Sequence, residues 1–302
     1  MTAKNFKIKR KIAKWGAFKS KFFATTMNVL NKLYLTNRKI EKLTHKKNIH
    51  YAKNKKCAYD IIYTKNYPQK KLPTIFLIHG GSYIAVDKKQ FTHLAKDFAS
   101  AGFLVVNINY RLMPEVYIKD CAQDCINAVK HVLNSCDKID RNNCFFIGDS
   151  AGANLACKVI YALKSKKSEI KINIRASLFL YGFFDARITN KLTKPFIEGL
   201  YEWKYIDFPI EHFYDEIDVL KNLDKHFPPC LIITSDNDFI KEHSYAMIDK
   251  LQNLNHDFEY IIFKKRLSSI HGFINIKNTA VYNISVDECL NFFKKRLKQI
   301  DK

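Results

Sequence analysis

Residues 148–152 read Gly148-Asp149-Ser150-Ala151-Gly152, and they lie between an apolar run at Cys144–Ile147 and a helical pattern at Asn154–Lys164. A serine placed between a buried strand and a helix must sit on a very sharp turn, which strains its backbone. The flanking Gly148 and Gly152 leave room for the chain that packs against such a turn. Ser150 is then held above the sheet edge at a helix amino terminus, where developing negative charge is favoured. The stretch predicts a strand–turn–helix unit that presents a nucleophile.

Short apolar runs alternate with helical patterns from about residue 60 onward. We predict buried strands at Thr74–His79, Phe103–Tyr110, Cys144–Gly148, Ala176–Tyr181, Leu231–Thr234 and Phe258–Phe263. We predict helices at Gln90–Ala99, Cys121–Asn134, Asn154–Lys164, Glu242–Leu254 and Ser285–Gln299. Alternating strands and helices imply an α/β fold with a doubly wound, mostly parallel sheet. Such a sheet binds its ligands at the carboxyl ends of the strands.

A second glycine-rich stretch, His79-Gly80-Gly81-Ser82-Tyr83, follows the first of these predicted strands. Acyl transfer builds an oxyanion, which preorganised backbone N–H groups stabilise. Glycines allow the backbone to approach a substrate closely. We therefore assign Gly80, Gly81, Ser82 and Ala151 to an oxyanion hole, with the amides of the last three as its expected donors.

Two further motifs follow predicted strands nearer the carboxyl terminus. Asp238 belongs to the stretch 234–238 at the end of one strand, and His271 lies after the next strand and before the last helix. A serine hydroxyl is a poor nucleophile until a base takes its proton, and a buried carboxylate orients that base. The order serine, aspartate, histidine at strand ends therefore predicts a catalytic triad of Ser150, Asp238 and His271.

The net charge of +22 is concentrated in one segment. Residues 1–56 hold 17 of the 51 lysines and arginines but a single acid, Glu41. Apolar residues recur at helical spacing from Ile8 to Leu33, which predicts one or two amphipathic helices across this basic arm. The arm could pack on the body as a cap, the interpretation we favour, or make peripheral contact with a membrane surface. No recognised nucleic-acid motif supports a nucleic-acid partner.

The eight cysteines are scattered singly and lack the paired spacing of zinc ligands. A chain of 302 residues can build a core without disulfides, so we expect a reducing, cytoplasmic location. No run reaches the ~18–20 uncharged apolar residues of a membrane span. The residues predict neither a bound metal nor an organic cofactor.

Taken together, these motifs resemble the hormone-sensitive-lipase-like branch of the α/β-hydrolases, which includes the bacterial acetyl esterases. The resemblance runs from about Thr74 to Lys295. It rests on five motifs in order, at residues 79–82, 110–115, 148–152, 238–242 and 271–273. It implies the α/β-hydrolase fold and the triad and oxyanion residues given above. It also implies that four motif residues support these groups: His79, Gly148, Asp149 and Gly152.

The chain departs from the family pattern at two places. Ser82 stands where the family has a third glycine, so a side chain lines the expected oxyanion hole. Phe239 replaces the usual proline after the acid, and Asp236 lies two residues before Asp238 as an alternative acid. The alignment favours Asp238.

Members of the family also carry a helical cap built from the N-terminal helices and an insertion after the sixth strand. The resemblance therefore divides the chain into cap helices at 1–56 and a catalytic domain at 57–302, with a cap insertion at about 183–229. Independently, the insertion is long for a connection and rich in aromatic residues, which favours an ordered structure.

The leading hypothesis is a serine carboxylic ester hydrolase that forms an acyl-enzyme from a small-molecule ester with short-to-medium acyl chains. An amidase or formamidase would use the same triad. A non-catalytic ligand-binding member of the fold is a third interpretation, although such proteins usually lose a triad residue and all three positions are filled here.

Overall fold

A computed structural model describes residues 42–65, 70–264 and 267–298 of the chain. Its strands are β1 (Leu43–His50), β2 (Ala58–Thr64), β3 (Leu72–Ile78), β4 (Leu104–Ile108), β5 (Ile139–Asp149), β6 (Ile174–Leu180), β7 (Cys230–Ser235) and β8 (Phe258–Phe263). Its α-helices are α2 (Thr92–Ser100), α3 (Ile118–Ser135), α4 (Ala151–Lys164), α5 (Lys194–Lys204), α6 (Ile210–Ile217), α7 (Lys241–Asn253) and α8 (Ala280–Lys298). Short 3-10 helices are η1 (Lys88–Phe91), η2 (Leu220–Asn222), η3 (Leu267–Ser269) and η4 (Phe273–Asn275).

The described strands form one eight-stranded sheet in the order β1-β2-β4-β3-β5-β6-β7-β8. The strands from β4 to β8 in this order pair in parallel, whereas β1 with β2 and β2 with β4 are antiparallel. The central strands are buried almost throughout because helices cover both faces, which explains their continuous apolar runs. The predicted doubly wound, mostly parallel sheet is confirmed.

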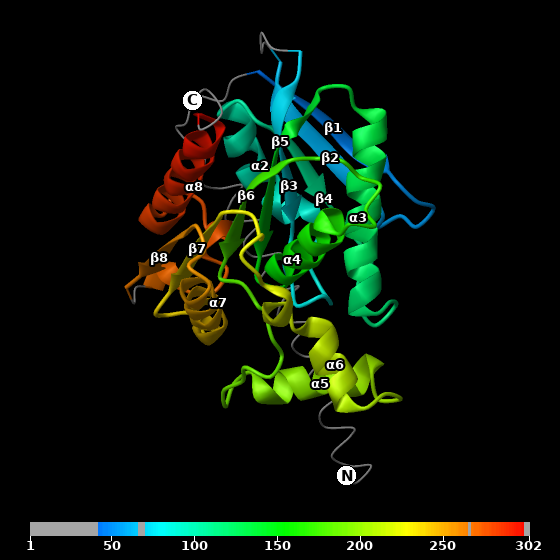
Figure 1. Ribbon diagram of the computed structural model, residues 1–302, viewed down its shortest axis with the longest axis vertical. Coiled ribbons are helices and arrows are strands. Elements are labelled where there is room, and N and C mark those ends of the chain that lie inside the picture. The colour runs from blue at the N-terminus through cyan, green and yellow to red at the C-terminus, as the bar shows by residue number, and fades with distance from the viewer. Residues whose placement is uncertain (1–41, 66–69, 265–266, 299–302) are drawn as a thin grey trace.

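Two apolar clusters hold the helices against the two faces of the sheet. Buried residues of α3, α4 and α7 belong to one cluster, and those of α2 and α8 belong to the other. Figure 1 shows this layering, with α3 and α4 on one side of the strands. The first cluster extends into α5 and α6, so its apolar contacts join the insertion to the body.

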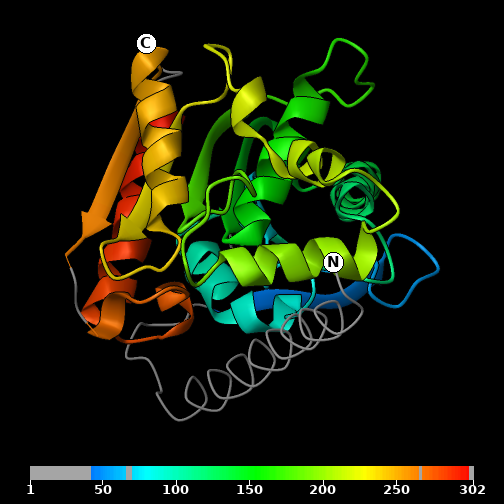
Figure 2. The same ribbon diagram turned by 90° about the horizontal axis from the view of Figure 1, so that it is seen from below.

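The insertion at residues 183–229 contains α5, α6 and η2. Figure 1 shows α5 and α6 together at the lower end of the molecule, and Figure 2 views them from that end. Aromatic side chains of the insertion pack on one another: the Tyr205 and Phe213 ring centroids are 5.0 Å apart, and those of Tyr201 and Phe213 are 5.9 Å apart. The insertion is thus an ordered helical layer, as its aromatic content indicates.

The expectation of helices across residues 1–56 is wrong for Leu43–His50, which form β1, an edge strand of the sheet. Asp60 on β2 fixes this strand, because its carboxylate accepts from the Asn48 amide at 2.8 Å and lies 3.1 Å from His45 Nε2. Lys88 Nζ, which is buried, lies 2.8 Å from the same carboxylate. Tertiary pairing therefore overrides the local basic pattern. The rest of the predicted arm, residues 1–41, lies outside the described residues.

Smaller differences concern element ends and one missed strand. β2 was not predicted, because its residues follow a charged stretch and Asp60 interrupts its apolar run. β5 begins five residues before the predicted Cys144, and α8 begins five residues before the predicted Ser285.

All eight cysteines are unpaired, and seven of them are buried. Among the described residues, no helix is long and apolar enough to cross a membrane.

Candidate active site

Ser150 lies between β5 and α4, at the turn that its sequence predicts. Its backbone has φ 50° and ψ −122°, a strained conformation for a residue with a side chain. A Cβ atom on Gly152 would lie 2.3 Å from the Ile78 carbonyl oxygen, and one on Gly148 would lie 2.4 Å from the Gly152 carbonyl oxygen. Both positions therefore require glycine for β5, α4 and β3 to approach so closely.

His271 joins Ser150 to Asp238 across three separate segments of the chain. The His271 Nε2 atom lies 3.0 Å from Ser150 Oγ. On the other side of the ring, Nδ1 lies 2.9 Å and 3.1 Å from the two carboxylate oxygens of Asp238. Asp238 is buried, and its Oδ1 also accepts from the Ile240 amide at 2.9 Å. The structure brings the three predicted triad residues together in one hydrogen-bonded line.

The environment of His271 makes it a stronger base than a free imidazole. Burial lowers the pKa of His271, but the negative charge of Asp238 and its hydrogen bond outweigh that effect and raise the pKa above its ordinary value. A histidine held between a hydroxyl and a buried carboxylate can take the hydroxyl proton and be stabilised as the imidazolium.

Asp236, the alternative acid, lies on the surface away from this line. Its carboxylate accepts a hydrogen bond from the Tyr245 hydroxyl at 2.7 Å. Its backbone amide donates to the Phe263 carbonyl oxygen, which holds the loop after β7 to the end of β8. Only Asp238 reaches the His271 ring in this arrangement.

The stretch after β3 passes beside the Ser150 turn, and buried side chains hold it in place. The Tyr110 hydroxyl donates to the His79 carbonyl oxygen at 2.6 Å, and the two rings stack with centroids 4.4 Å apart. His79 Nε2 contacts Asn109 Oδ1 at 2.9 Å, and the His79 side chain is fully buried. His79 thus supports the glycine-rich loop from inside the protein.

Four residues were predicted for the oxyanion hole, and the structure distinguishes them. The Gly80 amide donates to Asp149 Oδ1 at 2.7 Å, so this amide is directed at the carboxylate and away from a substrate. Ser82 and Ala151 line the same pocket as Ser150, and Gly81 precedes Ser82 with a φ of 98°. The amides of Gly81, Ser82 and Ala151 are the candidate donors, as the sequence predicts.

Asp149 was predicted only as a supporting position, and the structure gives it a specific contact. Its carboxylate is buried directly beneath the glycine-rich loop. Burial raises the pKa of Asp149 to about 7, although the Gly80 amide and the charge of His271 favour the ionised form. The sequence alone did not predict this pairing, because it forms only when β3 and β5 lie side by side.

The Asp149 pKa predicts a pH dependence of folding stability. The unfolded chain loses this proton near its ordinary pKa of 3.8 and the folded chain near 7, so the shift makes the folded state progressively less stable as pH rises from about 4 to 7. Asp149→Asn keeps an oxygen for the Gly80 amide but does not titrate. We expect its stability relative to the original protein to rise by roughly 1–4 kcal/mol between pH 4.5 and pH 8 in urea unfolding. A constant difference across that range would contradict the assignment.

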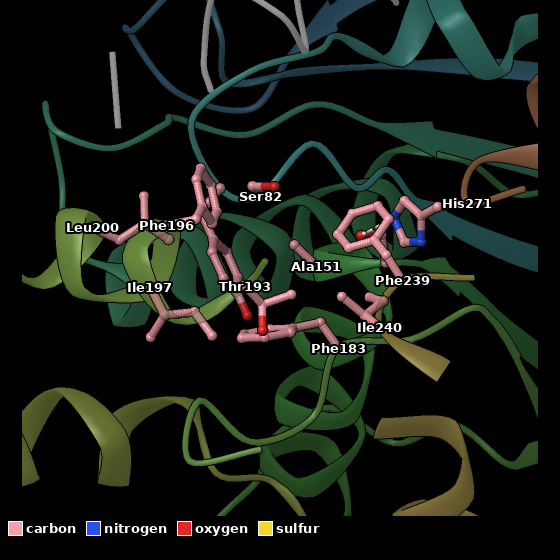
Figure 3. A pocket seen from close by; sticks show the side chains of 12 residues that line it. Ser82, Ala151, Phe183, Thr193, Phe196, Ile197, Leu200, Phe239, Ile240 and His271 are labelled. Carbon is pink, nitrogen blue, oxygen red and sulfur yellow. Dashed lines mark hydrogen bonds between the residues drawn. The ribbon is translucent and has the colours of Figure 1, made fainter. Parts of the chain in front are cut away.

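A cleft opens above Ser150. Its lining is mostly apolar and consists of Ser82, Tyr83, Ser150, Ala151, Phe183, Thr193, Phe196, Ile197, Leu200, Phe239, Ile240 and His271. Figure 3 shows the Phe196, Ile197 and Leu200 side chains at one end of the cleft and Phe239 beside His271 at the other. Thr193, Ile197 and Leu200 were not predicted from the sequence, although their spacing of four and three residues is typical of one helix face.

The α/β-hydrolase class is defined by a sheet of this order together with three side chains. A serine lies on a strained strand-to-helix turn, and an aspartate and a histidine follow later strands. The family model of the alpha/beta hydrolase fold matches residues 75–275, more than half of the chain. The chain therefore belongs to this family, and the resemblance to its hormone-sensitive-lipase-like branch is confirmed.

Named relatives and solved structures agree with this membership. The chain is 28% identical over 153 residues to probable carboxylesterase 2 of Arabidopsis thaliana, an alignment that covers 45% of this chain and 47% of the relative. The chain thus spans about half the length of that curated relative. Esterase B from Lactobacillus Rhamnosis shares its fold with a TM-score of 0.82 at 19% identity, over 97% of both chains. A bacterial heroin esterase matches with a TM-score of 0.72 at 17% identity, over 91% of this chain and 90% of the other.

Proposed function

We propose that this protein is a serine carboxylic ester hydrolase that acts on small-molecule esters with short-to-medium acyl chains. The observation that carries the proposal is the line of contacts from Ser150 Oγ through His271 to buried Asp238, at the floor of an apolar cleft. The names of the relatives, a carboxylesterase and two esterases, support the same reaction.

The geometry suits acyl transfer through a covalent intermediate. Ser150 Oγ attacks the ester carbonyl carbon while His271 Nε2 takes its proton, and Asp238 stabilises the resulting imidazolium. The amides of Gly81, Ser82 and Ala151 would hold the oxyanion, with the dipole of α4 adding to their field. His271 then returns the proton to the leaving alcohol, and water cleaves the acyl-enzyme by the same steps.

The lining of the cleft favours an ester over an amide. An amide substrate carries an N–H group that needs a hydrogen-bond acceptor once it is buried. Most side chains around the cleft are apolar, which suits an ester because it has no such donor. Parallel assays of a p-nitrophenyl ester and the matching p-nitroanilide test this choice. Faster turnover of the anilide would favour the amidase interpretation, and inertness toward both would favour a ligand-binding protein.

We expect the highest kcat/KM for acyl chains of roughly two to six carbons. Phe196, Ile197 and Leu200 of α5 close the end of the cleft farther from His271, where the acyl chain would extend. Esterase B has been solved with a C4-C4 SN3 tributyrin phosphonate and in a C6-C4 SN3 inhibited form, and these chain lengths fall within the proposed range. A series of p-nitrophenyl esters measures the optimum.

The acyl-length prediction has a matched variant. Phe196→Ala should lengthen the cleft and raise kcat/KM for the octanoate ester relative to the butyrate ester, because it removes a ring from the closed end. Better turnover of emulsified long-chain triglyceride than of soluble butyrate ester by the original protein would contradict the size limit.

A further inference from the structure

Phe239 combines two properties that structural packing does not explain. The residue is 49% exposed, yet it lines the cleft above Ser150. Its centroid lies 4.8 Å from that of the His271 imidazole, with the planes inclined at 56°. Figure 3 shows the two rings side by side at one end of the cleft. One side of the aromatic ring thus meets the candidate base, and much of the rest faces the opening.

The backbone around Phe239 is fixed on both sides. Ile240, the next residue, donates its amide to Asp238 Oδ1 at 2.9 Å, and the Asp238 amide donates to the Ser235 carbonyl oxygen. The Phe239 carbonyl oxygen accepts from Asn190 Nδ2 at 2.7 Å, which ties this segment to the loop before α5. The ring is therefore presented by a constrained turn that also holds the carboxylate.

The reaction determines which part of a substrate would meet this ring. His271 Nε2 must give its proton to the oxygen of the leaving alcohol, so the alcohol portion has to lie beside His271. The α5 residues lie at the opposite end of the cleft. The proposed function places the acyl chain at that end. An alcohol group seated next to His271 would then cover the exposed part of the Phe239 ring.

We propose that Phe239 is a specificity-determining residue for the leaving alcohol, and that it favours esters whose alcohol carries an aromatic ring. This inference rests on the proposed esterase function. Two aromatic rings in contact gain from an edge-to-face or offset arrangement beyond the area they bury. A saturated ring of the same size buries similar area but lacks that gain. The preference should therefore appear between aromatic and saturated alcohols of equal carbon count.

The test compares benzyl acetate with cyclohexylmethyl acetate, whose acyl groups are identical and whose alcohols are both primary. We expect the ratio of their kcat/KM values to be about fivefold in favour of benzyl in the original protein, equivalent to about 1 kcal/mol. Phe239→Leu should bring the ratio close to one, and Phe239→Tyr should preserve it. Tyr260→Leu is the control, because Tyr260 is also 49% exposed but lies on β8. It should leave the ratio unchanged.

A purely structural role for Phe239 gives a different result. If the ring only orients or shields His271, Phe239→Leu should lower turnover of both esters equally and leave their ratio as it was. That result, or the absence of a benzyl preference in the original protein, would overturn the inference while leaving the esterase function intact. If the protein hydrolyses none of the three esters (benzyl acetate, cyclohexylmethyl acetate and p-nitrophenyl butyrate), the proposed function is refuted and this inference with it.

Discussion

Replacing Ser150 with alanine should lower kcat for a p-nitrophenyl ester by about 10⁴ or more. The hydroxyl is the atom that attacks, and its 3.0 Å contact with His271 Nε2 is what turns it into a nucleophile. Alanine retains the Cβ atom, so the strained turn between β5 and α4 keeps its packing and the fold should persist. Initial rates measured beside a circular dichroism spectrum separate loss of chemistry from loss of structure.

The matched control is Ser165→Ala, a change at the opposite end of the same helix. Ser165 is exposed and follows the last residue of α4, so this variant should hydrolyse esters at the original rate. A serine-directed phosphonate should add its mass to the peptide that contains Ser150 and to no other peptide. Full activity of Ser150→Ala would refute the nucleophile assignment.

The residues around Ser150 could be placed from the sequence because their constraints are local. A glycine-flanked serine between an apolar run and a helical pattern fixes a sharp turn through neighbouring residues alone. The ends of parallel strands share one edge of a sheet, so Asp238 and His271 could be assigned to the same site from their positions after strands. These inferences need no knowledge of side-chain packing.

Other features depend on contacts between distant segments and were missed for that reason. β1 carries basic residues along a sheet edge, where pairing with β2 and the carboxylate of Asp60 outweighs the local pattern. The bond from the Gly80 amide to Asp149 arises only when β3 and β5 lie side by side. Likewise, Phe239 was noticed as a departure from the family pattern, but its contact with His271 required the folded arrangement.

The second large effect is expected at the acid. Asp238→Asn should lower kcat by about 10³–10⁴, whereas Asp236→Asn should change it only a few-fold. A neutral amide does not stabilise the imidazolium that forms on His271. Its N–H₂ group could also donate to His271 Nδ1, the nitrogen that now faces the Asp238 carboxylate, and so favour the wrong tautomer of the ring. Asparagine keeps an oxygen that can accept from the Ile240 amide, so the turn should remain folded.

The pH profile distinguishes an orienting acid from a residue that only supports the loop. Because the charge of Asp238 raises the pKa of His271, its removal should shift the rising limb of kcat/KM for the residual activity to lower pH. Asp236→Asn should leave that limb in place, since the Asp236 carboxylate is engaged by the Tyr245 hydroxyl and lies on the surface. Rates and pH profiles measured on both variants decide the assignment. A larger loss in Asp236→Asn, together with an unshifted limb in Asp238→Asn, would identify Asp236 as the acid that acts on His271.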